Sequence, residues 1–267
     1  MPYFDRIDER TFTPTEHVGG AWNLDEQHVG PSLGLLCHLV ERDHAERRGD
    51  RAGRLDVTRL SYDILGTLTM DPFTVDVDVR RAGRTIELVE ATVTQAGRAA
   101  VVLRAWLVQP GDTTSYAGTG LAPIAPPGTM GAWDPTALWA GGFIASAEVR
   151  RLQESPGRGA YWVRTVVPLL DEPISPTAAA AGLADIANGM TVRADPAEVV
   201  FPNVDLTAHL FRPPSAGWLG FDTTVSFGAG GHGLTSSTLH DESGPFGTLA
   251  QVLTVRPRPD ARAGHSA

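Results

Sequence analysis

Residues 30–49, GPSLGLLCHLVERDHAERRG, and residues 175–189, SPTAAAAGLADIANG, decide the fold of this chain. In the first stretch, four leucines and Val40 recur at the spacing of one helix face, and two arginines and a glycine follow, as is typical of a helix end. In the second, Ser175 and Pro176 suit an N-cap and a first helical residue, and Asn188-Gly189 supplies a stop. Both stretches are apolar and rich in small residues. We therefore predict two buried helices.

Each predicted helix is followed by four alternating, β-branched runs that predict strands. These runs cover 55–60, 73–80, 85–94 and 99–108 in the first half, and 204–211, 219–227, 234–240 and 249–255 in the second. The turn glycines Gly83 and Gly97 have counterparts at Gly230 and Gly244, each 147 positions later. We interpret this shared offset as the duplication of one unit, a long helix followed by antiparallel strands.

This unit predicts an α+β architecture in which a curved antiparallel sheet wraps around one buried helix. Two units can join their sheets edge to edge, which covers edges that would otherwise pair with other chains. We place the first domain at 1–112, a Pro- and Gly-rich linker at 113–136, the second domain at 137–257 and a flexible tail at 258–267. Clefts between the two lobes are then the expected ligand sites.

Composition excludes several classes of protein. The net charge of −9 argues against a nucleic-acid partner, because neutralising phosphates requires clustered basic residues. No run approaches the roughly 18 apolar residues that cross a bilayer, and the first residues lack the pattern of a secretory signal, so we expect no membrane insertion and a cytoplasmic location. The single cysteine, Cys37, lies among leucines and is interpreted as a buried thiol.

Few residues carry recognisable chemistry. The eight histidines form no His-x-x-x-His pattern, and there is no Gly-x-Ser-x-Gly motif, so we predict neither a metal site nor an α/β-hydrolase. Asp205 lies where a predicted strand begins. It is interpreted either as a cap of the strand end or as a functional base. Ser226 ends another strand. Gln251 lies in an apolar run, where it either faces outward or needs a partner, since an unpaired buried amide costs about 1–3 kcal/mol.

The repeated unit, the phrase DLTAHLFRP at 205–213 and the ending AQVLTVR at 250–256 resemble the type II acyl-CoA thioesterases. The stretch from Trp22 to Pro31, which leads into the first helix, agrees with the same family. The resemblance extends from about Phe12 to Arg256. It implies a double hotdog fold, in which each half is a sheet wrapped on a long helix and the two sheets join.

The resemblance also implies a catalytic trio of Asp, a hydroxyl residue and Gln that together hold one water. These roles fall on Asp205, Ser226 and Gln251, with Thr224 as the alternative hydroxyl. The carboxylate would take a proton from the water as it attacks the thioester carbonyl, and general-base assistance of this kind is typically worth about 10²–10⁴ in rate.

Donors for the developing oxyanion are expected at the start of the first helix, around Val29 and Gly30, because helix N-termini present free N–H groups. The expected activity is therefore hydrolysis of acyl-CoA to a carboxylic acid and CoA, in fatty acid metabolism and without a cofactor. Sheet edges favour a homo-oligomer. Two alternatives remain open: a non-catalytic acyl-chain or acyl-CoA binding protein, and an enoyl-thioester hydratase.

Overall fold

The structure, a computed structural model, describes residues 1–49 and 53–258. The predicted tail, 258–267, lies outside the described residues except for Arg258. The helices are α1 (Val29–Arg48), α2 (Gly142–Ala145) and α3 (Pro176–Ala184), and α3 continues directly into the 3-10 turn η6 (Asp185–Asn188). Among the described helices, none has both the length and the apolar character needed to span a bilayer.

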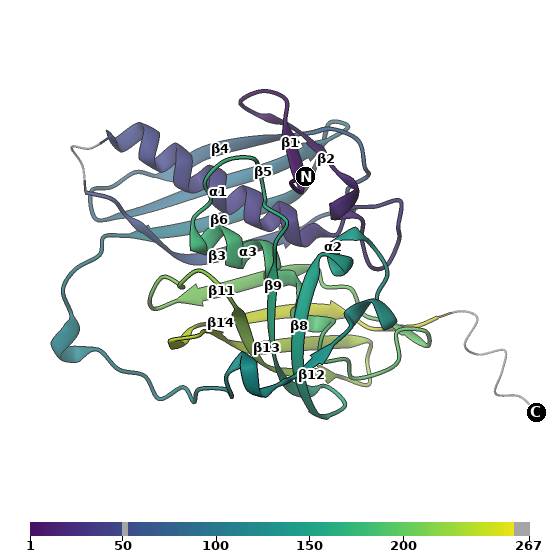
Figure 1. Cartoon of the computed structure of the whole chain (residues 1–267). Helices are drawn as coiled ribbons and strands as arrows, with labels where there is room; N and C mark the ends of the chain where they lie inside the picture. The colour runs from purple at the N-terminus through teal and green to yellow at the C-terminus, as the bar shows by residue number, and fades with distance from the viewer. Residues whose placement is uncertain (50–52, 259–267) are drawn as a thin grey trace, which may run out of the picture.

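The strands fall into two lobes that follow one another along the chain (Figure 1). The N-terminal lobe contains β1 (Phe4–Arg6), β2 (Thr11–Pro14), β3 (Asp56–Ile64), β4 (Phe73–Arg81), β5 (Ile86–Gln95) and β6 (Arg98–Val108). The C-terminal lobe contains β7 (Gly131–Trp133), β8 (Ala147–Ser155), β9 (Arg158–Thr165), β11 (Asp205–Leu210), β12 (Leu219–Phe227), β13 (His232–Asp241) and β14 (Gly244–Thr254). Two short strands, β10 (Val199–Val200) and β15 (Arg256–Pro257), pair separately.

Thirteen of the described strands form one continuous antiparallel sheet, in the order β1-β2-β4-β5-β6-β3-β11-β14-β13-β12-β9-β8-β7. Apart from the additional edge strand β7, the order reads alike from both ends, and the two lobes meet where β3 pairs with β11, for example at Leu60 and Ala208. The predicted duplication and edge-to-edge joining are confirmed, and so is the double hotdog architecture.

The sequence analysis missed several strands. The hairpin β8–β9 comes before α3, just as β1–β2 comes before α1, so the repeated unit is larger than predicted. A further strand, β7, lies inside the segment that was predicted to be a linker. At three residues, β7 is too short to show a periodicity, and pairing with a neighbouring strand decides its structure. The strands β8 and β9 have nine and eight residues and were overlooked in spite of their length.

Both long helices lie on the same side of the sheet (Figure 1). Along β11, Leu206 and Ala208 are buried with the core, whereas Asp205 and His209 alternate onto the opposite face. Successive strand side chains point to opposite faces, so this alternation fixes which residues can reach the interior between sheet and helices. Cys37 on α1 is fully buried, as predicted.

The two helices touch through glycines. A Cβ added at Gly34 of α1 would lie 2.7 Å from the Cα of Gly182 in α3 and 2.9 Å from the carbonyl oxygen of Ala178. The backbones are therefore in contact, with no room for a side chain on the α1 side. The contact brings the start of α1 beside the end of α3, which is where the candidate site lies.

We predict that Gly34→Ala lowers the free energy of unfolding by about 1–3 kcal/mol, because the new methyl group overlaps backbone atoms that cannot move aside. Gly182→Ala is the matched control. Its Cβ would meet nothing closer than 3.7 Å, so Ala gains up to about 1 kcal/mol from helix propensity. Urea unfolding of both variants measures the difference, and equal stability of the two would contradict the contact.

Candidate active site

Asp185 is the centre of the candidate site. It follows the last residue of α3, and its side chain is almost completely buried, with 5% of the residue exposed. Its Oδ1 atom accepts hydrogen bonds from Nδ2 of Asn203 at 2.7 Å and from Nε2 of Gln251 at 3.0 Å. A carboxyl group at the end of a helix is thereby held by two amides, one preceding β11 and one within β14.

Burial raises the pKa of Asp185 to about 7, because the charged form loses its hydration, and the hydrogen bonds from Asn203 and Gln251 offset only part of that effect. A carboxyl group that changes its charge near neutral pH can both take and return a proton at that pH. Perturbed carboxyl groups of this kind are concentrated at functional sites.

His28 comes from the other lobe and faces the same carboxyl group. Its Nδ1 atom accepts a hydrogen bond from the backbone N–H of Gly30 at 3.1 Å, which makes it the N-cap of α1, and lies 3.8 Å from Oδ2 of Asp185. Burial lowers the pKa of His28 to about 3. The ring is therefore neutral at pH 7, with its proton on Nε2, and the contact with Asp185 is not an ion pair.

Gln251 has a buried neighbour in Thr235, directly opposite it in the β13–β14 pair. Both residues are fully buried, and neither Oε1 of Gln251 nor Oγ1 of Thr235 has a hydrogen-bond partner among the described residues. Directly opposite side chains in an antiparallel pair lie about 5 Å apart on the same face. Since buried polar atoms are normally paired with protein or water, these two oxygens suit an ordered water beside Asp185.

A pocket of about 510 Å³ opens beside Asp185, between the two lobes. Its wall includes His28, Asp185, Asn203, the aromatic Trp22 and the first residue of α1, Val29. The N–H of Val29 belongs to the first turn of α1, where no helical carbonyl is available to it. A ligand in this pocket would meet a carboxyl group and a helix N-terminus together.

The structure places the site residues predicted from the sequence on both faces of the sheet. Gln251 is buried and has a polar partner, which was one of its two open interpretations. The carboxylate of Asp205 accepts the backbone N–H of Val252 at 2.6 Å, as a strand-end cap does. Among the described residues, the side chain of Gln251 is not a hydrogen-bond partner of Asp205, because β11 directs Asp205 away from the face that Leu206 occupies.

The predicted hydroxyl residues lie on the outer face of the sheet. Ser226 is exposed and lies opposite Leu234, which in turn lies opposite Val252, and both of these partners are 46% exposed. Thr224 is exposed as well. Gln251, one position before Val252, points to the other face, so the structure does not bring these hydroxyl groups to it.

Gly30 also differs from its prediction as an oxyanion donor. Its N–H is bonded to the His28 ring, and a Cβ added to Gly30 would lie 3.0 Å from the carbonyl oxygen of Gly182. The glycine thus serves the cap and the contact between helices. Val29 lies in the wall of the pocket, and its role as an oxyanion donor stays a prediction.

Sequence reasoning missed Asp185, Asn203, His28 and Thr235 as site residues. One signal was available, since Asp185 is the single charged residue in the apolar stretch 178–187. The sequence gives no comparable signal for the other three residues, because only the fold brings them together. Over the described ranges, no cluster of three or more His, Cys, Asp or Glu residues could hold a metal ion.

Two family models match the chain in succession. The acyl-CoA thioesterase N-terminal domain covers residues 18–108, and the acyl-CoA thioesterase C-terminal domain covers residues 122–255. The chain belongs to the acyl-CoA thioesterase family. Asp185, Asn203 and Gln251 fall within the second match, and His28 falls within the first. The site of this thioesterase-family chain is therefore built across both domains.

Solved structures share the fold of this thioesterase-family chain. A hot dog protein of unknown function from Alicyclobacillus acidocaldarius has a TM-score of 0.72 and 16% identity, and the likeness covers 94% of this chain and 95% of that one. An acyl-CoA thioesterase II from Mycobacterium marinum has a TM-score of 0.66 and 17% identity, over 96% and 97% of the two chains. No curated protein matches the sequence.

The raised pKa of Asp185 predicts a pH-dependent stability. The unfolded chain ionises this residue near 3.8, whereas the folded chain resists ionisation up to about 7, so its contribution to stability is lost as pH rises through that window. Asn cannot ionise. We expect the free energy of unfolding of Asp185→Asn, relative to the unmodified chain, to increase by about 2–3 kcal/mol between pH 5 and pH 8.

Asp241→Asn is the control for this experiment, because the pKa of Asp241 is shifted in the opposite direction. Hydrogen bonds from Arg212, Ser215 and Ser243 outweigh burial and lower the pKa of Asp241 to about 2. The stability that Asp241 contributes is therefore complete above its unfolded pKa, and its loss in the variant stays constant from pH 5 to pH 8. Urea unfolding at several pH values measures both, and a constant difference for Asp185→Asn would contradict the buried, titrating carboxyl group.

Proposed function

We propose that the chain hydrolyses acyl-CoA thioesters to a free carboxylic acid and CoA, with Asp185 as the general base for an attacking water. One observation carries this proposal: a buried carboxyl group with a pKa near 7, held by Asn203 and Gln251 in a pocket between the lobes. A general base works best when its pKa lies near the working pH. Membership of the acyl-CoA thioesterase family supports the choice of substrate.

The hydrogen bonds around Asp185 suit this role. Both amide donors bind Oδ1, and Oδ2 is left to accept a proton from water. As the water oxygen bonds to the thioester carbon, its proton passes to Oδ2. Collapse of the intermediate breaks the C–S bond, and the same proton is available for the departing thiolate. Fixed amide donors cost no reorganisation during these steps.

The negative charge on the carbonyl oxygen needs a donor on the other side of the reacting carbon. The N-terminus of α1 at Val29 lies in the wall of the same pocket and offers N–H groups and the positive end of the helix dipole. In this proposal one lobe supplies the base and the other supplies the oxyanion site. A single lobe would lack half of the machinery.

A hydratase is the second candidate, because the structure places His28 beside Asp185, and a hydratase of acyl thioesters uses a paired His and Asp. The environment of His28 favours the thioesterase. Its Nδ1 is occupied by the N–H of Gly30, and its lowered pKa makes it a weak base. Incubation with an enoyl-CoA separates the two functions, since hydration leaves the thiol of CoA bound and hydrolysis releases it.

Two other sequence predictions are carried forward as part of this proposal. We propose a homo-oligomer and a cytoplasmic location for the enzyme. Sedimentation of the purified chain tests the first, and fractionation of the producing cells tests the second.

We predict that Asp185→Asn lowers kcat for acyl-CoA hydrolysis by at least about 10²-fold, because the amide cannot accept the proton of the attacking water. Asp205→Asn is the matched variant, and it should stay within about threefold of the unmodified chain, since that carboxylate caps a strand on the other face. Release of free thiol from a panel of acyl-CoA substrates measures both. If Asp205→Asn lost activity and Asp185→Asn kept it, the general base would be Asp205.

The activity should also depend on pH in a defined direction. Only the ionised form of Asp185 accepts a proton, so kcat should rise as pH increases through about 7 and level off above it. The same assay, run from pH 5 to pH 9, gives the profile. A rate that is already at its maximum at pH 5 would exclude this carboxyl group as the base.

A further inference from the structure

The wall of the pocket beside Asp185 carries little positive charge. Its acidic residues are Glu26 and Asp185, and Arg258 is the single arginine or lysine among the described residues of this wall. His28 adds no charge at pH 7, because burial lowers its pKa to about 3. Arg258 is therefore the one positive group at neutral pH in the described part of the wall.

Arg258 is held against the C-terminal lobe by the strand pair β10–β15. Val200 of β10 lies opposite Arg256 of β15, and both Val200 and Arg258 line the pocket. The backbone N–H of Arg258 donates to the carbonyl oxygen of Glu198 at 2.7 Å. Its side chain is anchored too, since Nε donates to the carbonyl oxygen of Pro196 at 2.9 Å. Two hydrogen bonds therefore fix the position of the guanidinium group.

The outer part of this guanidinium group is available to a ligand. Within the described ranges, the bond from Nε is the only hydrogen bond of the Arg258 side chain, and no carboxylate forms an ion pair with it. Its Nη1 and Nη2 atoms therefore keep their donors for a ligand. A guanidinium group presents these donors as a planar fork, which matches the oxygens of a phosphate group.

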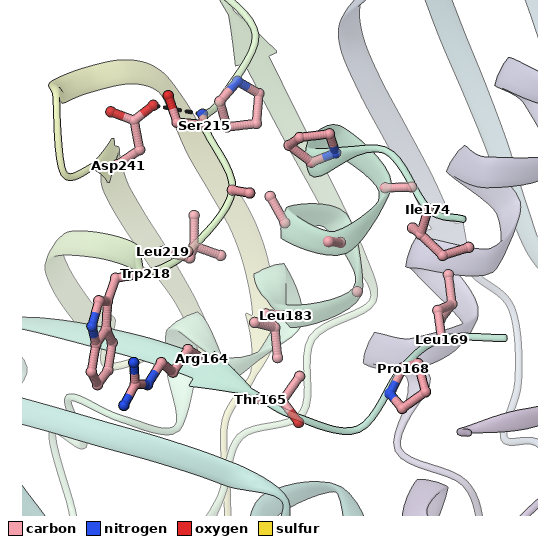
Figure 2. Close-up of a pocket in the computed structure, with 18 of the residues that line it drawn as sticks. Arg164, Thr165, Pro168, Leu169, Ile174, Leu183, Ser215, Trp218, Leu219 and Asp241 are labelled. Carbon is pink, nitrogen blue, oxygen red and sulfur yellow. Dashed lines mark hydrogen bonds between the residues drawn. The ribbon is translucent and has the colours of Figure 1, made fainter. Parts of the chain in front are cut away.

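A second pocket, of about 670 Å³, shows how charged wall residues are otherwise paired in this protein (Figure 2). It lies between α3, the segment that follows β9 and the loop before β12. Its charged wall residues all have an ion-pair partner, and the pairs are Arg164–Glu148, Glu172–Arg6 and Asp241–Arg212. An arginine with no such partner among the described residues distinguishes the pocket beside Asp185.

The separation of Arg258 from the candidate site suits one part of CoA. In an acyl-CoA, a pantetheine arm joins the sulfur to the first phosphate, and its reach is about that of four to five extended residues, or roughly 15 Å. Glu198, the backbone partner of Arg258, precedes Asn203 by five residues, so their Cα atoms lie at most about 18 Å apart. Asn203 binds Asp185. An arm that starts at Asp185 can therefore place its phosphate at Arg258.

We propose that Arg258 binds the first phosphate of an acyl-CoA, the one next to the pantetheine arm, while the thioester group lies at Asp185. This inference rests on the proposed function and identifies the part of CoA that the pocket recognises. The net charge of −9 repels a phosphate-bearing substrate over most of the surface, so a positive group at the pocket supplies a local attraction. The Nη atoms donate to the phosphate oxygens, and the bond from Nε keeps the group in place.

The same phosphate also joins a pantetheine arm to acyl carrier proteins. Membership of the acyl-CoA thioesterase family makes CoA the expected source. The unmodified chain should therefore have a higher kcat/KM for an acyl-CoA than for the same acyl group on an acyl carrier protein. A preference for the carrier protein would overturn CoA as the source of the phosphate.

Arg258→Gln tests the phosphate contact, and Arg256→Gln is the matched control. Arg256 is exposed and belongs to the same strand pair, but it does not line the pocket. The substrates carry one acyl group on CoA, on phosphopantetheine or on pantetheine, which lacks the phosphate. We expect Arg258→Gln to raise KM for the first two about five- to tenfold and to leave kcat unchanged, because a contact far from the reacting carbon binds ground state and transition state alike.

The phosphate-free substrate isolates this contact. For acyl-pantetheine, the KM of Arg258→Gln should stay within about twofold of the unmodified chain, and Arg256→Gln should change none of the three values. Salt at about 0.5 M should reduce the effect of Arg258→Gln, because the contact is electrostatic and exposed. An equal rise in KM for acyl-pantetheine, or no rise for any substrate, would overturn the proposal. A rise for acyl-CoA alone would place the contact at a phosphate of the nucleotide and overturn it as well.

Binding of CoA separates this proposal from the proposed function. If the unmodified chain cleaves none of these thioesters, calorimetric titration with CoA and with pantetheine still decides. Weaker binding of CoA alone in Arg258→Gln supports the phosphate contact, and equal binding of CoA by the two proteins overturns it. If the chain cleaves the thioesters but Arg258→Gln behaves like the control, only the phosphate contact is wrong. Thermal unfolding should show that both variants are folded.

Discussion

The contact between the backbones of α1 and α3 sets the geometry of the rest of the molecule. Gly34 leaves no room for a side chain against Gly182 and Ala178, so the backbones of the two helices are in contact there. The antiparallel pairing of β3 with β11 fixes the lobes at the same junction. Together these contacts bring the first residues of one helix beside the last residues of the other, and the candidate site needs both ends.

The partners of Asp185 determine what its carboxyl group can do. A buried carboxyl group paired with a cation loses its proton at low pH, as Asp241 does beside Arg212, where the pKa falls to about 2. Asp185 instead receives neutral amide donors, from Asn203 and Gln251, and its pKa stays near 7. Amides orient the carboxyl group without fixing its charge. The same fold thus contains a structural carboxylate and one that is suited to proton transfer.

Much of the fold could be predicted from the sequence, because the constant offset between turn glycines reports the duplication directly, and the Ser175-Pro176 cap marks the second helix. The site was harder. Asp205 was chosen because it begins a strand. Whether such a residue points inward depends on the pairing register of the strand, and a shift of one residue turns its side chain to the other face of the sheet. Asp185 lies in an irregular turn after a helix, and its partners at 28, 203 and 251 are distant in sequence. Only the paired sheet brings them together.

A crystal structure with a non-hydrolysable ketone analogue of a long-chain acyl-CoA is the most direct measurement of the central idea, that a buried carboxyl group between the lobes performs the chemistry. We expect the ketone carbon beside Asp185 and Gln251, and its oxygen toward the start of α1. A ketone bound beside Asp205 and Ser226 on the outer face of the sheet would contradict it.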